Sequence, residues 1–287
     1  MCDLKTVKDT EEFLQLNRRD FGKASAAAGL SMMLPAVANA QELTESYHDI
    51  ETDDGVADCF FVRPATGEHP AVLIWPDILG LRPAFEMMAR RLAQSGYSVL
   101  VPNPFYRGAR APVVPEGASF QDPAVRETVF PLAGMLNADT HFTDARAFIQ
   151  FLDDQDAVDS SRGMGTTGYC MGGPMVMRTM ATSDRMRAGG TFHGGGLATD
   201  AENSPHLLIP EMEGASMLIA IAENDDQEEP EVKNILRDAF AANNIPAEIE
   251  VYPAQHGWCP PDMPVYDETQ AERAWARLLN LFDNALA

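Results

Sequence analysis

Short apolar runs and segments of helical periodicity alternate along most of the chain. The run Ala-Val-Leu-Ile-Trp at 71–75 is typical of a strand buried on both faces, and 98–102 is a second such run. Between them, apolar residues recur at i, i+3, i+4 and i+7, which predicts a helix that begins at Pro83 and ends at Gly96. The three segments together predict a strand-helix-strand unit.

The same alternation continues to the end of the chain. Further strands are predicted at 163–168, 188–192, 217–222 and 248–252. Further helices are predicted at 142–153, directly after Cys170, at 230–243 and over the apolar positions of 271–282. This pattern indicates the α/β fold class, with a mainly parallel central sheet and helices on both faces, in a single domain.

Two segments depart from the alternation. Strand-like runs at 47–52 and 56–63 flank the turn-forming Asp53-Asp54-Gly55, which predicts an antiparallel hairpin. The segment 103–141 is rich in proline and shows no clear periodicity. Because long irregular segments of compact domains are often lids or binding loops, this segment is a candidate for either role.

The first 40 residues resemble an export signal. A pair of arginines at 18–19 precedes a mildly apolar, alanine-rich stretch that ends in Ala38-Asn39-Ala40. The pattern is similar to a twin-arginine signal peptide; the alternative is an amphipathic N-terminal helix. We expect the twin-arginine export machinery to recognise residues 1–40, which leaves residues 41–287 as a mature domain in the periplasm or outside the cell.

Charge and cysteine content narrow the range of functions. With 43 acidic and 21 basic residues the net charge is -22, which disfavours binding to nucleic acid or anionic lipid. The longest weakly polar stretch, 24–40, contains polar residues and a proline, so no membrane insertion is expected in the mature form. Three cysteines follow residue 40, namely Cys59, Cys170 and Cys259, and this odd number leaves at least one thiol outside any intramolecular pair.

The sequence Gly168-Tyr-Cys-Met-Gly172 lies between a predicted strand and a predicted helix, which is the context of a nucleophile elbow. So tight a turn requires small residues two positions before and after the nucleophile, and glycine occupies both. A thiol of Cys170 at a helix N-terminus would favour the thiolate, and the N–H of Met171 would point at a developing oxyanion. The alternative is a glycine-rich turn with a buried structural cysteine.

A base and an acid follow in the order expected for such hydrolases. His256 lies in a predicted loop after the strand at 248–252, where an imidazole could deprotonate the thiol. The acidic segment 222–227, predicted to be a loop, offers Asp225 to orient His256, and Asp226 is the alternative.

Four motifs together resemble the dienelactone hydrolase family, over about residues 45–285. They are Gly-Tyr-Cys-Met-Gly-Gly at 168–173, Glu-Asn-Asp at 223–225, His-Gly-Trp at 256–258 and Pro-Asp-Ile-Leu-Gly-Leu at 76–81. The resemblance implies a single-domain α/β-hydrolase fold and the opening of dienelactone rings to maleylacetate. It also implies that Cys170, His256 and Asp225 form the catalytic triad.

The resemblance further implies roles around the triad. The family has a glutamate that activates the resting thiol, and Asp77, one methylene shorter, occupies the matching position; its alternative role is that of a turn residue. The same loop would supply a second oxyanion N–H, from Ile78. Family members bind the substrate carboxylate with two arginines. Arg107 matches the first, Pro260 stands at the second position, and Arg82 is the candidate to compensate. Surface ion pairs are the alternative for both arginines.

The remaining candidates line the expected pocket. His193 follows a strand at the same sheet edge as the triad, where it would line the pocket or be an ordinary loop histidine. Trp258, beside His256, is a further candidate for substrate binding. No zinc-ligand spacing and no glycine-rich nucleotide loop occurs, so neither a metal nor another cofactor is expected.

The sequence therefore predicts an exported, cysteine-dependent hydrolase of small ester or lactone substrates that acts through a thioester intermediate. It leaves the oligomeric state open, with a monomer favoured. The alternatives are a broad-specificity carboxylesterase and a noncatalytic protein of the same fold that binds a small ligand or partner.

Overall fold

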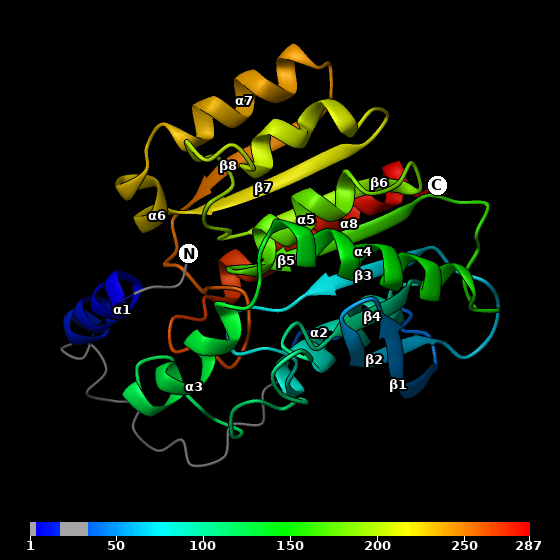
Figure 1. The fold of residues 1–287 in the computed structure, drawn as a ribbon, viewed down its shortest axis with the longest axis horizontal. Helices are drawn as coiled ribbons and strands as arrows, with labels where there is room; N and C mark the ends of the chain where they lie inside the picture. The colour runs from blue at the N-terminus through cyan, green and yellow to red at the C-terminus, as the bar shows by residue number, and fades with distance from the viewer. Residues whose placement is uncertain (1–3, 18–33) are drawn as a thin grey trace.

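One sheet organises the protein. A computed structural model describes residues 4–17 and 34–287, and the eight strands of this part pair in the order β1-β2-β4-β3-β5-β6-β7-β8 (Figure 1). They are β1 (Leu43–Thr52), β2 (Gly55–Pro64), β3 (Ala71–Trp75), β4 (Ser98–Pro102), β5 (Met164–Tyr169), β6 (Met186–Phe192), β7 (Ser216–Ala222) and β8 (Ala247–Tyr252). The pairs β1–β2 and β2–β4 are antiparallel and all other neighbours are parallel. The predicted α/β fold, with its N-terminal hairpin, is confirmed.

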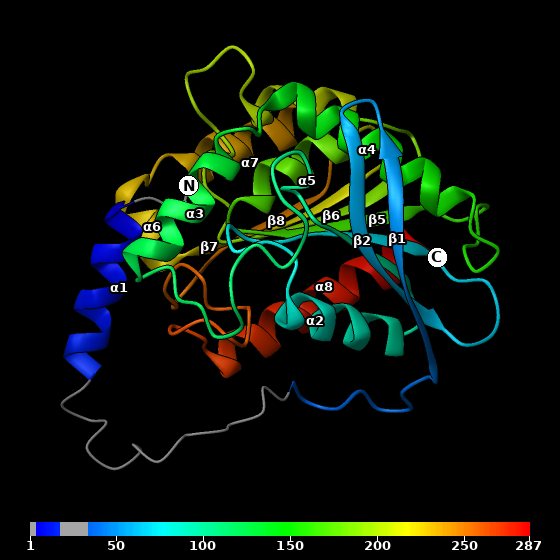
Figure 2. The ribbon, with the colours of Figure 1, turned by 60° about the horizontal axis from the view of Figure 1, so that its bottom comes forward.

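Helices cover both faces of the sheet. They are α1 (Leu4–Asn17), α2 (Pro83–Gln94), α3 (Pro123–Ala133), α4 (Ala138–Asp153), α5 (Gly172–Met180), the 3-10 helix η1 (Pro205–Glu211), α6 (Glu223–Glu228), α7 (Val232–Ala242) and α8 (Glu268–Ala285). One apolar core joins α4, α5 and α7 to the sheet, and a second core joins α2 and α8 to its opposite face (Figure 2). The strands between them are almost entirely buried, as their continuous apolar runs predict.

The segment 103–141 is more regular than the sequence suggested. It contains α3, and α4 begins at Ala138, four residues before the predicted start. Asp122 caps α3 by accepting the N–H of Ala124, while Asn137 and Thr140 form a capping box on α4. Both helices are thus marked in the sequence by capping residues and not by apolar periodicity. The acidic segment 222–227 is likewise not a loop, because Glu223–Glu228 forms the short helix α6.

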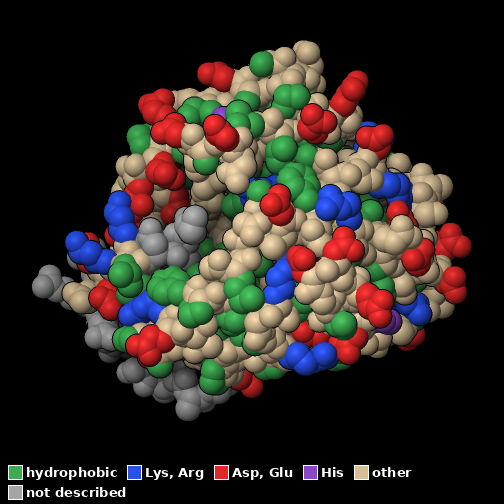
Figure 3. Space-filling model, in the orientation of Figure 1, with side chains coloured by type: hydrophobic (Ala, Val, Ile, Leu, Met, Phe, Trp, Pro, Cys, Tyr) green, Lys and Arg blue, Asp and Glu red, His purple; other side chains and the backbone are tan. Residues whose placement is uncertain are grey.

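The N-terminal region contains a helix, α1, over residues 4–17. The predicted arginine pair at 18–19 and most of the alanine-rich stretch lie outside the described residues. The chain is described again from Leu34, which packs against the α2–α8 core. None of the helices among the described residues is both long and apolar enough to cross a bilayer. Acidic side chains are scattered over the whole face seen in Figure 3, in keeping with the net charge.

Two buried groups on α4 and α5 predict a pH dependence of stability. Arg178 Nη1 lies 3.1 Å from His141 Nδ1, which therefore accepts. Burial, followed by the charges of Arg178 and Arg107, lowers the pKa of His141 to about 3. The unfolded chain, with a histidine pKa of ~6.5, then binds more protons between these two values, so the free energy of unfolding falls as pH decreases from about 6.5 towards 3.

We expect the substitution His141→Gln, which keeps an acceptor for Arg178, to flatten this dependence by up to ~1.4 kcal/mol per pH unit. Urea unfolding at pH 7 and pH 4.5, on wild type and variant, measures the difference. Equal losses of stability on acidification in the two proteins would contradict the assignment.

Candidate active site

Cys170 stands at a sharp turn between β5 and α5. Its φ is +53°, a left-handed conformation that is rare for a residue with a side chain and recurs at strained functional turns. A Cβ on Gly168 would lie 2.5 Å from the carbonyl oxygen of Gly172, and one on Gly172 would lie 2.5 Å from that of Trp75. Both positions therefore exclude any side chain, which is the steric reason for the Gly-x-Cys-x-Gly pattern.

The three cysteines after residue 40 differ in state. The sulfur of Cys170 belongs to a disulfide in this structure, whereas Cys59 and Cys259 are free and buried, so neither is its partner. Burial raises the pKa of the Cys59 and Cys259 thiols well above the usual value. These two thiols are held neutral and unreactive.

His256 and Asp225 form a close pair. The two carboxylate oxygens of Asp225 lie 3.0 and 2.8 Å from His256 Nδ1. Because a carboxylate can only accept, Nδ1 carries the proton and Nε2 is left as the basic nitrogen. Asp226 points elsewhere and pairs with Lys233 Nζ at 2.5 Å. Of the two predicted acids, Asp225 is the one that orients His256.

A neighbouring residue that sequence reasoning did not single out holds the histidine loop in place. Asn224 Oδ1 accepts the backbone N–H of His256 at 2.8 Å. The short helix α6 thus supports His256 twice, through its backbone and through its ring. The Glu-Asn-Asp motif contained this residue, but the distant partner of its amide is visible only in the folded chain.

One pocket brings most of the predicted site together. Cys170, His256, Asp77, Ile78 and His193 all line it. The remainder of the wall is Ser119, Phe120, Gln121, Gly257, Met263, Pro264 and Val265, together with Thr6 and Thr10 of α1. The segment 103–141 thus contributes to the pocket, as expected of a binding segment. Met171, the N-cap residue of α5, packs against the apolar cluster around Cys170.

Asp77 is engaged by Arg82. Its Oδ1 accepts the backbone N–H of Leu79 at 2.9 Å, and its two oxygens accept from Arg82 Nη1 and Nη2 at 2.7 and 2.9 Å. Arg82 also bonds both oxygens of Asp262 and the carbonyl of Gly80, so all five of its N–H groups are used. Burial alone would lower the pKa of Arg82, but the two carboxylates outweigh it and raise that pKa. Arg82 therefore has no N–H group left to bind a substrate anion. The expectation that it replaces the missing family arginine is corrected.

Arg107 is also committed to other partners. Its guanidinium contacts Asp144 of α4 and Asp54 of the β1–β2 turn, both at 2.6 Å. It lies outside the pocket lining, and no lysine or arginine among the described residues lines that pocket. The predicted carboxylate clamp of Arg107 and Arg82 is thus not assembled, because both side chains neutralise buried carboxylates instead.

His193 lies against the triad histidine. Its ring centre is 4.9 Å from that of His256 and 5.0 Å from that of Trp258. Burial, and then the nearby His256, lower the pKa of His193 well below the usual value, so the ring is neutral. Neither ring nitrogen has a hydrogen-bond partner among the described residues. Trp258 is fully buried and stacks on Tyr252, so it supports His193 from behind and does not line the pocket.

The ion pairs of Arg82 with Asp77 and Asp262 predict that loss of this arginine strongly destabilises the protein. We expect Arg82→Met to lower the free energy of unfolding by about 3–5 kcal/mol, because it leaves two carboxylates without their cation and Asp77 is almost completely buried. Urea unfolding measures the change. Arg110→Met is the matched control, since the side chains of Arg110 and its partner Asp49 are both more than half exposed and the loss of this pair should leave the unfolding midpoint unchanged. Equal effects of the two substitutions would contradict this account.

The arrangement resembles known hydrolases in sequence and fold. Residues 57–286 match the model of the dienelactone hydrolase family. A Salmonella typhi protein is 28% identical over 236 residues, which cover 78% of this chain and 81% of its own length. Carboxymethylenebutenolidase 1 of Cupriavidus pinatubonensis is 24% identical over 220 residues, 76% of this chain and 88% of that protein.

A solved structure shows the same fold. The crystal structure of a dienelactone hydrolase-like promiscuous phosphotriesterase from metagenomic libraries aligns with a TM-score of 0.70 and 22% sequence identity, over 85% of this chain and 99% of the other. Among the described residues, no group of three or more histidine, cysteine or acidic side chains is arranged to hold a metal ion.

Proposed function

Because this chain belongs to the dienelactone hydrolase family, we propose that it hydrolyses small esters or lactones with Cys170 as nucleophile. The observation that carries the proposal is the 2.8 Å contact between His256 and Asp225, with His256 lining the same pocket as Cys170 on its nucleophile elbow. Nucleophile, base and orienting acid are the three parts that such chemistry requires.

The acylation half of the reaction begins from the reduced thiol. His256 Nε2 takes the proton of Cys170, and the thiolate attacks the carbonyl carbon of the substrate. The backbone N–H groups of Met171 and Ile78 are proposed to bind the oxyanion. The C–O bond to the leaving alcohol then breaks, His256 returns its proton to that oxygen, and the acyl group remains on sulfur as a thioester.

Deacylation uses the same groups. His256 removes a proton from water, the hydroxide attacks the thioester carbonyl, and the C–S bond breaks with return of the proton to the sulfur. Asp225 stays ionised throughout and stabilises the protonated imidazole. The products are the carboxylic acid and the alcohol, and in a lactone both remain in one molecule.

Two further residues have supporting roles in the proposal. Asp77 is proposed as a positioning residue, because it accepts the N–H of Leu79 and so fixes the loop that carries Ile78. His193 is proposed to contact the substrate, since its neutral ring lines the pocket beside His256 and its nitrogens have no hydrogen-bond partner within the described part of the chain.

The pocket favours neutral substrates, which supports broad-specificity carboxylesterase activity as the second candidate. Phe120, Met263 and Val265 make much of the wall apolar, and no lysine or arginine of the described residues lines it. Asp77 and the net charge of -22 add no attraction for an anion. A carboxylate-bearing dienelactone would therefore bind less tightly than a neutral ester of similar size.

A substrate panel tests the proposal. The full chain and residues 41–287, both with dithiothreitol, are assayed on dienelactone, a neutral lactone and neutral p-nitrophenyl esters. We expect hydrolysis with the higher kcat/KM on the neutral compounds, and a quenched reaction should show the acyl group on the peptide that contains Cys170. Absence of both hydrolysis and acylation would favour the noncatalytic ligand-binding alternative.

We also propose that residues 1–40 are a twin-arginine export signal and that residues 41–287 act in the periplasm or outside the cell. The support is the arginine pair at 18–19 and the Ala38-Asn39-Ala40 ending. Replacing both arginines with lysine should retain the protein in the cytoplasm with its N-terminal segment uncleaved, as cell fractionation and mass spectrometry would show.

A further inference from the structure

Helix α1 lies over the pocket that contains Cys170. Val7 is only 7% exposed and belongs to the apolar cluster formed by Ile78, Leu79 and Cys170 with residues of the segment 103–141. Thr6 and Thr10, one on each side of Val7 along the helix surface, line the same pocket as Cys170 and His256. The helix therefore covers the site with its own side chains.

An ion pair joins α1 to the helix that carries the acid of the triad. Lys5 Nζ pairs with Glu228 at 2.7 Å, and Glu228 ends α6, the helix that carries Asp225. Both ribbon views show α1 beside α6 and α3, at the end of the molecule where the strands β5 and β7 deliver the site residues (Figures 1 and 2). This ion pair ties α1 to the helix that carries Asp225.

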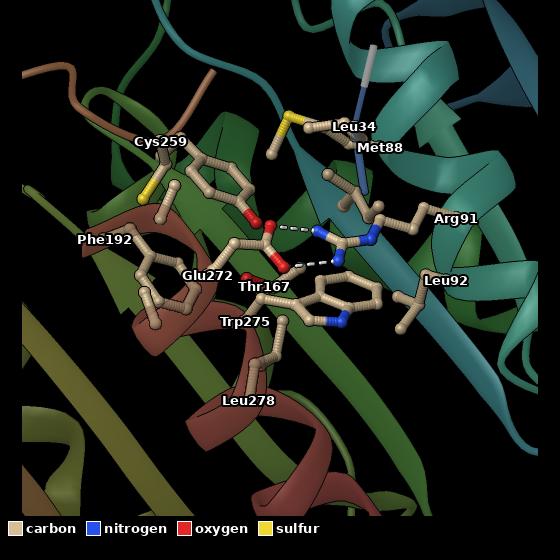
Figure 4. Close-up of a pocket in the computed structure, with 14 residues that line it drawn as sticks. Leu34, Met88, Arg91, Leu92, Thr167, Phe192, Cys259, Glu272, Trp275 and Leu278 are labelled. Carbon is tan, nitrogen blue, oxygen red and sulfur yellow. Dashed lines mark hydrogen bonds and ion pairs between the residues drawn. The ribbon is translucent and has the colours of Figure 1, made fainter. Parts of the chain in front are cut away.

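A second anchor holds the N-terminal region farther along the chain. Leu34 lines a crevice between α2 and α8, next to Met88 and above the Arg91–Glu272 ion pair, whose two hydrogen bonds are both 2.6 Å (Figure 4). The backbone N–H of Gln41 then bonds the carbonyl of Gln94 at the end of α2. The segment before β1 is therefore bound to the hydrolase domain at two separate places.

We propose that residues 4–17 are an intramolecular plug, which keeps the active site closed until the segment 1–40 is removed. This inference rests on the proposed function, because it names a regulation of the same site. A substrate carbonyl that reaches Cys170 must occupy the space that Thr6, Val7 and Thr10 fill, so substrate and α1 exclude each other. The apparent kcat/KM of the full chain is then the intrinsic value multiplied by the fraction of molecules with α1 undocked.

The plug can leave without loss of the fold. All eight strands lie between Leu43 and Tyr252, and the helices α2, α4, α5, α7 and α8 cover both faces without α1. The family match over 57–286 also excludes the plug. Residues 41–287 therefore contain a complete core, and the same cleavage proposed for export would activate the enzyme.

Four proteins test the inference, all reduced with dithiothreitol: the full chain, residues 41–287, full-length Val7→Asp and full-length Glu11→Gln. Val7→Asp places a charge in the apolar cluster, whereas Glu11 is exposed on α1 and serves as the control. We expect kcat/KM on a neutral p-nitrophenyl ester to be roughly 10- to 100-fold higher for 41–287 and Val7→Asp than for wild type. This factor corresponds to the free energy of burying one apolar side chain, which shifts the equilibrium between docked and undocked α1. Glu11→Gln should stay within about twofold of wild type.

A second readout separates this inference from the proposed function. After removal of the reductant, the rate of Cys170 alkylation by iodoacetamide is followed by mass spectrometry in the same four proteins. Faster alkylation in 41–287 and Val7→Asp supports the plug even if no protein hydrolyses any ester, in which case only the proposed function fails. Equal alkylation and equal kcat/KM in all four proteins would overturn the plug.

Discussion

Replacing Cys170 with alanine is expected to lower kcat/KM for a neutral ester by at least about 10⁴-fold, because the nucleophile that forms the thioester is lost. The assay uses residues 41–287, so that α1 is absent, and contains dithiothreitol, so that the Cys170 sulfur enters as a thiol. The variant should still fold, since alanine retains the Cβ and the elbow conformation depends on Gly168 and Gly172. Urea unfolding provides that check.

The other two cysteines of this domain supply matched controls. Cys59→Ala and Cys259→Ala remove thiols that are buried and whose pKa burial raises, and neither residue lines the pocket of Cys170. Both variants should keep kcat/KM within about twofold of wild type while losing some stability to a small cavity. Retention of more than about 1% of activity by Cys170→Ala, or a comparable loss in Cys259→Ala, would refute the assignment of the nucleophile.

The sheet was predictable because its strands are buried on both faces. Runs such as Ala71–Trp75 allow almost no polar residue, so they stand out in the sequence, and the helix that begins at Pro83 carries a regular apolar stripe. The helices α3 and α6 have weaker stripes: α6 buries none of its residues, and α3 depends on the cap of Asp122. Apolar periodicity indicates which residues are buried, and α3 buries only Val125 and Val129 while α6 buries none, so neither helix carries a pattern long enough to recognise.

The triad was predictable for a different reason. Steric demands around Cys170 fix two glycines within five residues, and chain order places an acidic segment and then His256 at the ends of later strands. The sequence could not decide between Asp225 and Asp226, because adjacent residues of a helix face different directions and only the fold shows which one faces His256. Asp226 forms an ion pair with Lys233, seven residues farther on, whereas Asp225 contacts His256.

The ion-pair partners of Arg82 and Arg107 could not be predicted from the sequence, because most of them are distant along the chain and come close only when it folds. Arg82 meets Asp262, which is 180 residues away in the chain, and Arg107 meets Asp54 and Asp144. In a chain with twice as many acidic as basic residues, every buried carboxylate competes for a cation. The same competition leaves the pocket, as lined by residues 4–17 and 34–287, without lysine or arginine, which is the physical basis for expecting neutral substrates.

Asp225→Asn is expected to lower kcat by about 10³- to 10⁴-fold on the same ester. The asparagine side chain is as large as that of aspartate, but it carries no charge that would stabilise the imidazolium. Its amide N–H can also donate a hydrogen bond to Nδ1. That reversal holds His256 in the tautomer whose Nε2 is protonated and no longer basic. Asp225 is about one quarter exposed at its side chain, so the substitution should cost little stability, which urea unfolding can confirm.

The neighbouring residue separates orientation of His256 from loss of a negative charge. Asp226→Asn removes the same charge one position away, from a carboxylate that pairs with Lys233, and should leave kcat within about twofold of wild type. Asn224→Ala should fall between the two, because it removes the acceptor of the His256 backbone N–H but leaves the ring paired. Equal losses of kcat in Asp225→Asn and Asp226→Asn would mean that only the removed negative charge matters. Asp225 would then not be the acid of a triad with Cys170 and His256.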